Sequence, residues 1–200
     1  MSEQLSVLEP AVPARHPIHL VVTDDLRRSR LTVFFRFLLV IPHLVWLTLW
    51  GIAVWFALLA AWFVGIFTGR VPEGLHGFIA SYIRYMTHVH AYWYLAANPF
   101  PAFNGAPGYP IDVEIAPAAK QSRLTIFFRL LLAIPALILA YVFLLGLEIV
   151  ALFGWIVSIL TGKMPQGLEN LGTYLLRWET QSRAYTMLLT GHYPSLSGIG

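Results

Sequence analysis

One segment of this chain occurs twice. Residues 29–42, SRLTVFFRFLLVIP, recur as residues 122–135, SRLTIFFRLLLAIP, and the match extends without a gap from residues 16–101 to residues 109–194 at a constant offset of 93. Two long copies are too few for a solenoid, so we expect a duplicated unit whose halves pack about a pseudo-two-fold axis, as in a fused dimer. The predicted division is an N-terminal tail (1–15), repeat 1 (16–101), a linker (102–108), repeat 2 (109–194) and a C-terminal tail (195–200).

The composition is typical of an integral membrane protein. Hydrophobic residues make up 58% of the chain and charged residues only 12%, and the mean hydropathy is +0.67, outside the usual range of globular domains. The thirteen lysines and arginines are scattered beside apolar runs and form no basic face, which favours membrane lipids as partners and argues against nucleic acid. The chain has no cysteine, which excludes disulfide bonds and thiolate chemistry.

Each repeat begins with a short stretch of strand-like sequence. Residues 18–22 and 111–115 are rich in β-branched residues and are bounded by proline or polar residues, so we expect two short strands outside the membrane. The two strands could pair with each other across the pseudo-axis, because an isolated strand leaves its backbone groups without partners.

A long uncharged run follows in each repeat, at residues 37–69 and 130–162. As a single helix each run would be roughly 50 Å long, against a hydrocarbon core of about 30 Å. We therefore expect each run to form a transmembrane hairpin that turns near Gly51 or Gly146. The predicted fold class is an all-α integral membrane protein with about four membrane helices in total, plus one amphipathic helix per repeat.

Three tryptophans support the hairpin. Trp46, Trp50 and Trp55 cluster around the expected turn of the first repeat, where they would form an aromatic belt at the far interface. The arginines of the repeated motif lie at the opposite end of the hairpin. Arg30, Arg36, Arg123 and Arg129 are predicted to anchor the chain to anionic lipid headgroups.

The last element of each repeat is a predicted amphipathic helix, at residues 75–97 and 168–190. A narrow polar stripe on each helix includes Arg84 in the first copy and Arg177 in the second. The helix could lie on the membrane with this stripe toward the headgroups, or cross it with the stripe toward a neighbouring helix. We favour the surface arrangement, because it keeps all basic residues on the cytoplasmic side together with both termini.

Glu148 is the one acidic residue within an apolar run, and Trp55 occupies the equivalent position of repeat 1. An ionisable group in such a run suggests transport or proton relay. In a hairpin it would reach the far interface, whereas in a single crossing it would pair with Arg84 or Arg177 or stay protonated.

No other pattern indicates chemistry. His88 and His90 point to different sides of a helix, and the second copy has Gln181 and Arg183 in their places, so we expect no metal site. The sequence contains no phosphate-binding loop, nucleophile elbow or zinc-protease motif. We predict no catalytic residue, no cofactor and no enzymatic activity.

The repeated features resemble a prokaryotic membrane protein family known as domain of unknown function 4389. They are the motif S-R-L-x-x-F-F-R-x-L-L-x-I-P, the loop T-G-[RK]-x-P-x-G-L, the aromatic helix with its arginine, and the closing proline segment, each present twice. The closing segment departs from the Tyr-Pro-Pro-Phe of that family, since it reads NPFPAF in repeat 1 and YPSL in repeat 2. The resemblance implies residence in the cytoplasmic membrane and no established activity.

The sequence thus predicts a non-enzymatic, multi-pass membrane protein. Its expected role is that of an accessory or scaffold subunit, or of a lipid-associated organiser, within a larger membrane complex or a homo-oligomer. The alternative is a small transporter or channel that uses the interface between the two repeats.

Overall fold

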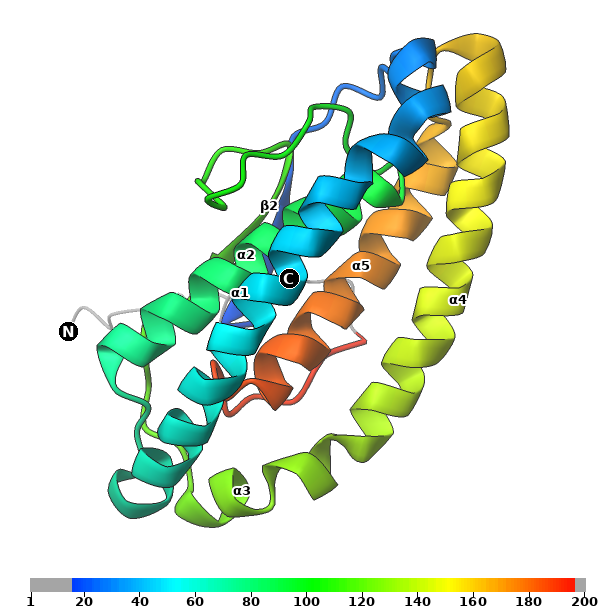
Figure 1. Cartoon of the computed structure of the whole chain (residues 1–200). Helices are drawn as coiled ribbons and strands as arrows, with labels where there is room; N and C mark the ends of the chain where they lie inside the picture. Colours follow the sequence, from blue (N-terminus) through cyan, green and yellow to red (C-terminus); the bar gives the residue numbers. More distant parts are fainter. Residues whose placement is uncertain (1–15, 197–200) are drawn as a thin grey trace, which may run out of the picture.

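The computed structural model describes residues 16–196 and is mostly helical, with one small sheet (Figure 1). The predicted tail 1–15 and residues 197–200 lie outside the described residues. The sheet forms one layer, the shorter helices α2 and α5 a second, and the long helices α1 and α4 a third. In chain order the elements are β1 (Ile18–Val22), α1 (Arg30–Thr68), α2 (Glu73–Trp93), β2 (Ile111–Ile115), α3 (Arg123–Phe127), α4 (Arg129–Thr161) and α5 (Gln166–Thr186).

The two repeats are related by a pseudo-two-fold axis that passes through all three layers. The predicted pairing of the strands is confirmed: β1 and β2 form an antiparallel sheet in which Leu20 lies opposite its own equivalent, Val113. In the next layer, the Oγ1 atoms of Thr87 and Thr180, which are also equivalent residues, lie 3.3 Å apart. Pairs of equivalent residues meet only on such an axis.

Each repeat completes the other. β1 packs on α5 and β2 packs on α2, so each strand lies against the helix of the other repeat. At one end of the long helices, Trp62 Nε1 donates to the carbonyl of Ile126, and at the other end Trp155 Nε1 donates to the carbonyl of Val33. Both distances are 3.1 Å, as expected of a reciprocal interface.

The predicted transmembrane hairpins are not present. α1 is one continuous helix of 39 residues, and α4 is one helix of 33 residues. Each ends at a glycine in the left-handed conformation, Gly69 at φ 71° and Gly162 at φ 73°, whose N–H groups donate to Gly65 and Ser158. Within residues 16–196, two helices are long and apolar enough to cross a membrane, and the four predicted membrane helices are not shown.

The glycines that suggested turns serve helix packing instead. A Cβ atom on Gly51 would lie 3.1 Å from the hydroxyl of Tyr82 on α2, and one on Gly146 would lie 3.2 Å from Leu175 on α5. The missing side chains let each long helix approach its shorter neighbour closely. An isolated glycine within a helical pattern can therefore mark a close helix contact and not a turn.

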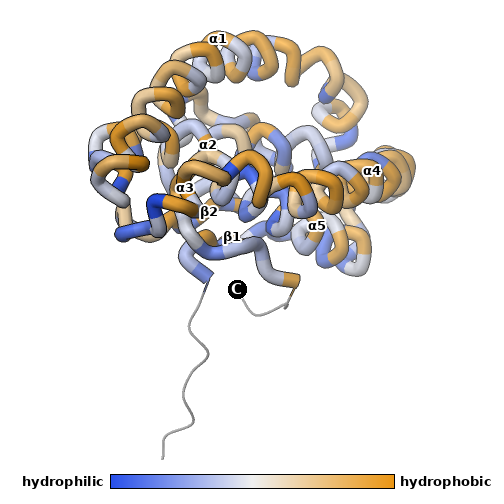
Figure 2. Tube along the Cα trace, turned by 90° about the horizontal axis from the view of Figure 1, so that it is seen from below, coloured by the Kyte–Doolittle hydropathy of each residue, from blue (hydrophilic) through white to orange (hydrophobic). Residues whose placement is uncertain are grey.

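The outer face of the long helices is exposed and apolar. Only 11% of the most apolar window of α1 and 22% of that of α4 is buried, unlike the core helix of a soluble protein. Hydrophobic residues follow α1, α3 and α4, whereas hydrophilic residues are more frequent near the sheet (Figure 2). The molecule thus has one apolar face and, opposite to it, one polar face.

Candidate functional site

The second arginine of each repeated motif lies inside the protein. Arg36 and Arg129 are only 2% and 1% exposed. The Arg36 guanidinium lies 4.3 Å from the centroid of the Tyr92 ring, and its Nη1 atom donates to the Tyr92 carbonyl. The Arg129 guanidinium lies 4.1 Å from the Tyr185 ring, and its Nη1 atom donates to the Thr190 carbonyl.

Arg36 and Arg129 are therefore not exposed at the surface, as the predicted anchoring to lipid headgroups would suggest. The carbonyl groups at the C-terminal end of a helix have no partner within the helix and attract cations. The two buried guanidinium groups satisfy such carbonyls where α2 and α5 end, and the tyrosine rings add cation–π stabilisation.

A second pair of buried donors supports the same two helix ends, and the sequence pattern did not reveal it. Arg28 is 3% exposed, and its Nε atom donates to the carbonyl of Leu95 at 3.0 Å. Its equivalent, Gln121, donates from Nε2 to the carbonyl of Leu188 at 2.8 Å. Leu95 and Leu188 both lie in the left-handed region of backbone conformation, at φ 60° and 63°.

The first arginine of each motif remains at the surface. Arg30 and Arg123 are exposed, so lipid anchoring stays a prediction for these two residues. An isolated antiparallel β-bridge between the backbones of Arg27 and Lys163 brings the start of α1 to the end of α4. A backbone hydrogen bond from Gln121 N to Gly69 O likewise brings the segment before α3 and α4 to the end of α1. Exposed cations therefore gather at two opposite ends of the molecule: Arg27, Arg30 and Lys163 at one end, and Arg70, Lys120 and Arg123 at the other.

The three predicted tryptophan anchors lie in the middle of α1, away from its ends. Trp46 and Trp55 are 42% and 57% exposed on the apolar face, and Trp46 Nε1 donates to the carbonyl of Phe103. Trp50 faces inward and stacks on the Tyr85 ring. A role as lipid anchors stays a prediction for Trp46 and Trp55, whereas Trp50 packs within the protein.

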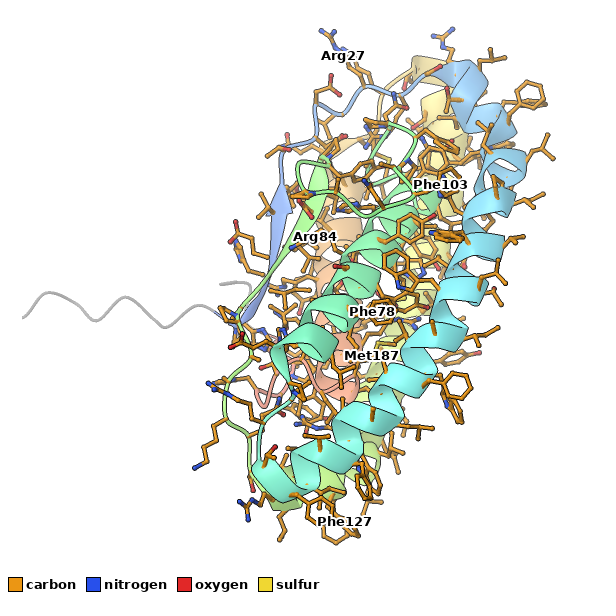
Figure 3. The ribbon with its side chains drawn as sticks, turned by 60° about the vertical axis from the view of Figure 1, so that its left-hand side comes forward. Arg27, Phe78, Arg84, Phe103, Phe127 and Met187 are labelled. Carbon is orange, nitrogen blue, oxygen red and sulfur yellow. The ribbon has the colours of Figure 1, made fainter. Side chains whose placement is uncertain are left out.

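The polar stripe of α2 and α5 faces other protein elements. Arg84 lies between α2 and the sheet, 3.5 Å from the carboxylate of Asp112, on the side of α2 away from α1 (Figure 3). Its equivalent, Arg177, is 8% exposed and stacks on the Tyr174 ring. The favoured arrangement, with this stripe toward lipid headgroups, does not fit these contacts, because the stripe packs on the sheet and at the interface between the repeats.

The pKa values of two carboxylates, the half-buried Asp112 and the buried Glu179, are lowered. Burial alone would raise the pKa of Asp112, but the hydrogen bonds from His88 at 2.8 Å and from the backbone lower it. Burial would likewise raise the pKa of Glu179, but Arg183 and His90 outweigh that effect and hold the pKa well below 4.5. Both groups are therefore ionised at neutral pH, and each is stabilised by neighbours from α2, α5 or the sheet.

Glu148 is exposed on α4, and its Oε1 atom accepts a hydrogen bond of 3.3 Å from the hydroxyl of Tyr94. The pairing with Arg84 or Arg177, one of the two alternatives for a single crossing, is not present, since those side chains have the partners described above. Glu148 thus lies at the surface of α4, on the side that faces the end of α2.

The histidines do not converge. His76 Nε2 lies 3.2 Å from the carbonyl of Leu189, His88 contacts Asp112, and His90 lies 3.5 Å from Glu179. Within residues 16–196, no three histidine, aspartate or glutamate side chains form a group that could hold a metal ion.

Comparison with known proteins identifies a family. No curated protein and no solved structure matches the chain. A family model, described as a domain of unknown function (DUF4389), matches residues 30–104 and again residues 123–197. The two matches cover most of the chain and are separated by the same offset of 93 residues as the two repeats. The chain therefore belongs to the DUF4389 family, of which it carries two tandem copies.

Proposed function

We propose that this protein is a non-enzymatic membrane protein that organises lipid or serves as an accessory subunit of a larger assembly in the cytoplasmic membrane. The observation that carries the proposal is the apolar face of α1 and α4, where large hydrophobic residues are exposed from Leu31 to Phe67 and from Leu130 to Leu160. Soluble proteins rarely expose apolar patches larger than a few hundred Å². The exposed basic residues at both ends of this face complement anionic headgroups.

The lengths of the two helices bear on their orientation. At about 1.5 Å per residue, α1 is about 58 Å long and α4 about 50 Å, against a hydrocarbon core of about 30 Å. To place the whole apolar face of α1 in hydrocarbon while crossing, the helix would have to tilt by roughly 60°, beyond the range of about 0–40° known for membrane helices. A crossing orientation would therefore leave part of the apolar face in water.

The position of the sheet also argues against a crossing orientation of the long helices. In an upright molecule the sheet, which lies beside the middle of α2, would enter the bilayer (Figure 3). Its two strands have open edges, and Glu114 is exposed, which hydrocarbon does not tolerate. An upright molecule would also divide the exposed cations equally between the two membrane sides, contrary to the usual positive-inside bias.

We therefore propose that α1 and α4 lie along one leaflet, with their outer face in the hydrocarbon and the sheet toward the cytoplasm. The pseudo-two-fold axis is then the membrane normal, and both repeats present equivalent surfaces to the lipid. The two described ends of the chain meet on the sheet side, where His16 Nε2 lies 3.3 Å from the carbonyl of Tyr193. Multi-pass crossing is the competing arrangement.

Single cysteines in this cysteine-free chain test the orientation. We place them at Arg27 and Arg70, at opposite ends of α1, and treat intact cells and inside-out vesicles with a membrane-impermeant maleimide. Labelling of both ends from the cytoplasmic side only is expected. Labelling of the two ends from opposite sides would establish crossing instead. Glu114→Cys is the control for a water-facing site, and Ile52→Cys, which is 55% exposed on the apolar face, the control for a lipid-facing one.

A transporter or channel is the second candidate function. Its support is the set of buried polar groups near the interface between the repeats, including Thr87, Thr180 and Glu179. Reconstitution into liposomes tests it: ion flux that Glu148→Gln abolishes would favour transport and proton relay. Reproducible capture of a larger complex in mild detergent, without flux, is the result expected for an accessory protein.

A further inference from the structure

A cavity of about 370 Å³ opens on the apolar face near the start of α1, between α1, the end of α2, and α4. Three aromatic side chains line it: Phe37, Trp93 and Trp155. Trp155 is fixed by its hydrogen bond to the start of α1, and Phe37 meets Trp93 edge to face with 5.3 Å between ring centroids. The volume lies within the range of about 300–1,000 Å³ that small-molecule sites occupy.

Arg36 is one of the residues that line this cavity, and its guanidinium has hydrogen-bond donors without a partner in the described part of the chain. Its Nη1 atom donates to backbone carbonyls, but Nε and Nη2 are buried and have no partner among residues 16–196. None of the ion pairs in that part of the chain includes Arg36. A buried cation without a counter-ion is costly, so an acceptor group in the cavity would stabilise it.

The pseudo-symmetry explains why, among the described residues, Arg36 lacks a partner at Nη2 whereas Arg129 has one. The Nη2 atom of Arg129, the equivalent residue, donates to the side chain of Gln121. At the position equivalent to Gln121, repeat 1 has Arg28, which has only donors and uses them on Asp24 and on backbone carbonyls. Four lining positions of the cavity also differ from their symmetry mates: Phe37, Trp93, Glu148 and Ala151 correspond to Leu130, Thr186, Trp55 and Leu58.

Glu148 adds the opposite charge to the same cavity. The cavity is thus lined by both an exposed carboxylate and a buried guanidinium. These two groups match a ligand that carries one positive and one negative group. The mouth of the cavity is apolar, because Phe37 and Leu152 are 59% and 58% exposed there, and it opens on the face that the proposed function assigns to lipid. We propose that this cavity binds a zwitterionic phospholipid headgroup, with its phosphate at Arg36 and a primary ammonium group at Glu148.

Calorimetric titration of the detergent-solubilised full chain tests the site. The probes are dihexanoyl-phosphatidylethanolamine and dihexanoyl-phosphatidylglycerol, below their critical micelle concentrations; both carry the phosphate, but only the first carries an ammonium group. Saturable binding with a preference for phosphatidylethanolamine is expected. Glu148→Gln should weaken that ligand about tenfold and leave phosphatidylglycerol unchanged or improved, because it removes one charge-assisted contact.

Ala151→Leu introduces the residue of the symmetry mate and should abolish binding of both probes by filling the cavity. Ala60→Leu, at an exposed position on the apolar face of α1, is the matched control and should bind as the wild type does. Equal binding by wild type and Ala151→Leu, or no saturable binding by wild type, would overturn the proposal.

The proposed headgroup site rests on the proposed membrane function. Vesicle flotation shows which of these two proposals fails if probe binding is not found. Wild-type protein that floats with vesicles but binds neither probe contradicts only the headgroup site. Protein that does not float contradicts the proposed function itself. Flotation of Ala151→Leu together with loss of probe binding supports both.

Discussion

Two arginines in the same short motif have opposite environments. Arg30 and Arg123 are exposed at the ends of the molecule, whereas Arg36 and Arg129 are buried beneath the ends of α2 and α5. The motif alone does not distinguish them, because both kinds of arginine border an apolar run. Their different partners predict different consequences of substitution.

We expect Arg129→Lys to lower the free energy of unfolding by about 2 kcal/mol. Lysine is charged but lacks the planar fork that contacts Gln121 and Thr190 and stacks on Tyr185. Thermal unfolding in detergent measures the change. Arg123→Lys, at the exposed arginine of the same motif, is the matched control and should change stability by less than about 0.5 kcal/mol. Equal effects of the two substitutions would contradict the assigned roles.

Glu179 predicts an acid-dependent loss of stability. Its pKa in the folded protein falls from 4.5 to about 2, chiefly because Arg183 and His90 outweigh the effect of burial. The ionised form is thus favoured by folding, so its stabilisation is fully present above pH 4.5 and is lost as the pH falls from 4.5 toward about 2. Glu179→Gln should flatten the stability curve in that window, whereas Glu114→Gln, at an exposed carboxylate, should leave its slope unchanged.

Each long helix runs without a break through the glycine that suggested a turn, and this glycine faces a neighbouring helix. Gly51 and Gly146 contact α2 and α5, and the helix caps lie further on at Gly69 and Gly162. The sequence pattern places the apolar runs correctly. It cannot decide between a turn and a close helix contact at an isolated glycine, since that depends on a side chain about 30 residues away, such as Tyr82.

Proline substitution tests the continuity of α1. Gly51→Pro should destabilise the protein by about 3 kcal/mol, because proline in a helix interior removes a hydrogen bond and clashes with the preceding turn. Gly74→Pro is the control, since Gly74 lies in the first turn of α2 with open space around it, where proline is tolerated. A hairpin turn at Gly51 would instead accept proline, and a small loss of stability at that position would favour it.

The whole molecule behaves as a fused dimer whose halves exchange elements. The strand of each repeat packs on the helix of the other, and the start of each long helix meets the end of its partner. Neither repeat could bury its polar stripe alone, because the stripe of α2 faces β2 and the stripe of α5 faces β1. Because the two repeats depend on each other, we expect equivalent residues that meet on the pseudo-two-fold axis to stay in contact in the folded protein.

A disulfide across the axis checks this prediction. The chain lacks cysteine, so Thr87→Cys combined with Thr180→Cys introduces one pair, at positions whose Oγ1 atoms lie 3.3 Å apart. Mild oxidation should produce an intramolecular cross-link, seen as faster migration of the monomer in a denaturing gel that is reversed by reductant. Thr87→Cys with Thr186→Cys, nearly two turns further along α5, should form none. Cross-linked dimers in place of monomers would indicate that the axis relates two chains instead.

The sequence by itself determined the duplication, the positions of the strands and the long apolar runs, because repetition and periodicity can be recognised along the chain without knowledge of its tertiary contacts. Its composition predicted a membrane protein. It also suggested the pairing of the strands, since two short strands in equivalent positions have no other partners. Only the tertiary structure decided that each run is one helix, that Arg36 and Arg129 are buried, and that Glu148 faces a cavity with Arg36. Those features depend on which residues of one repeat meet the other, and the interactions that bring them together are formed only when both repeats fold around their common axis.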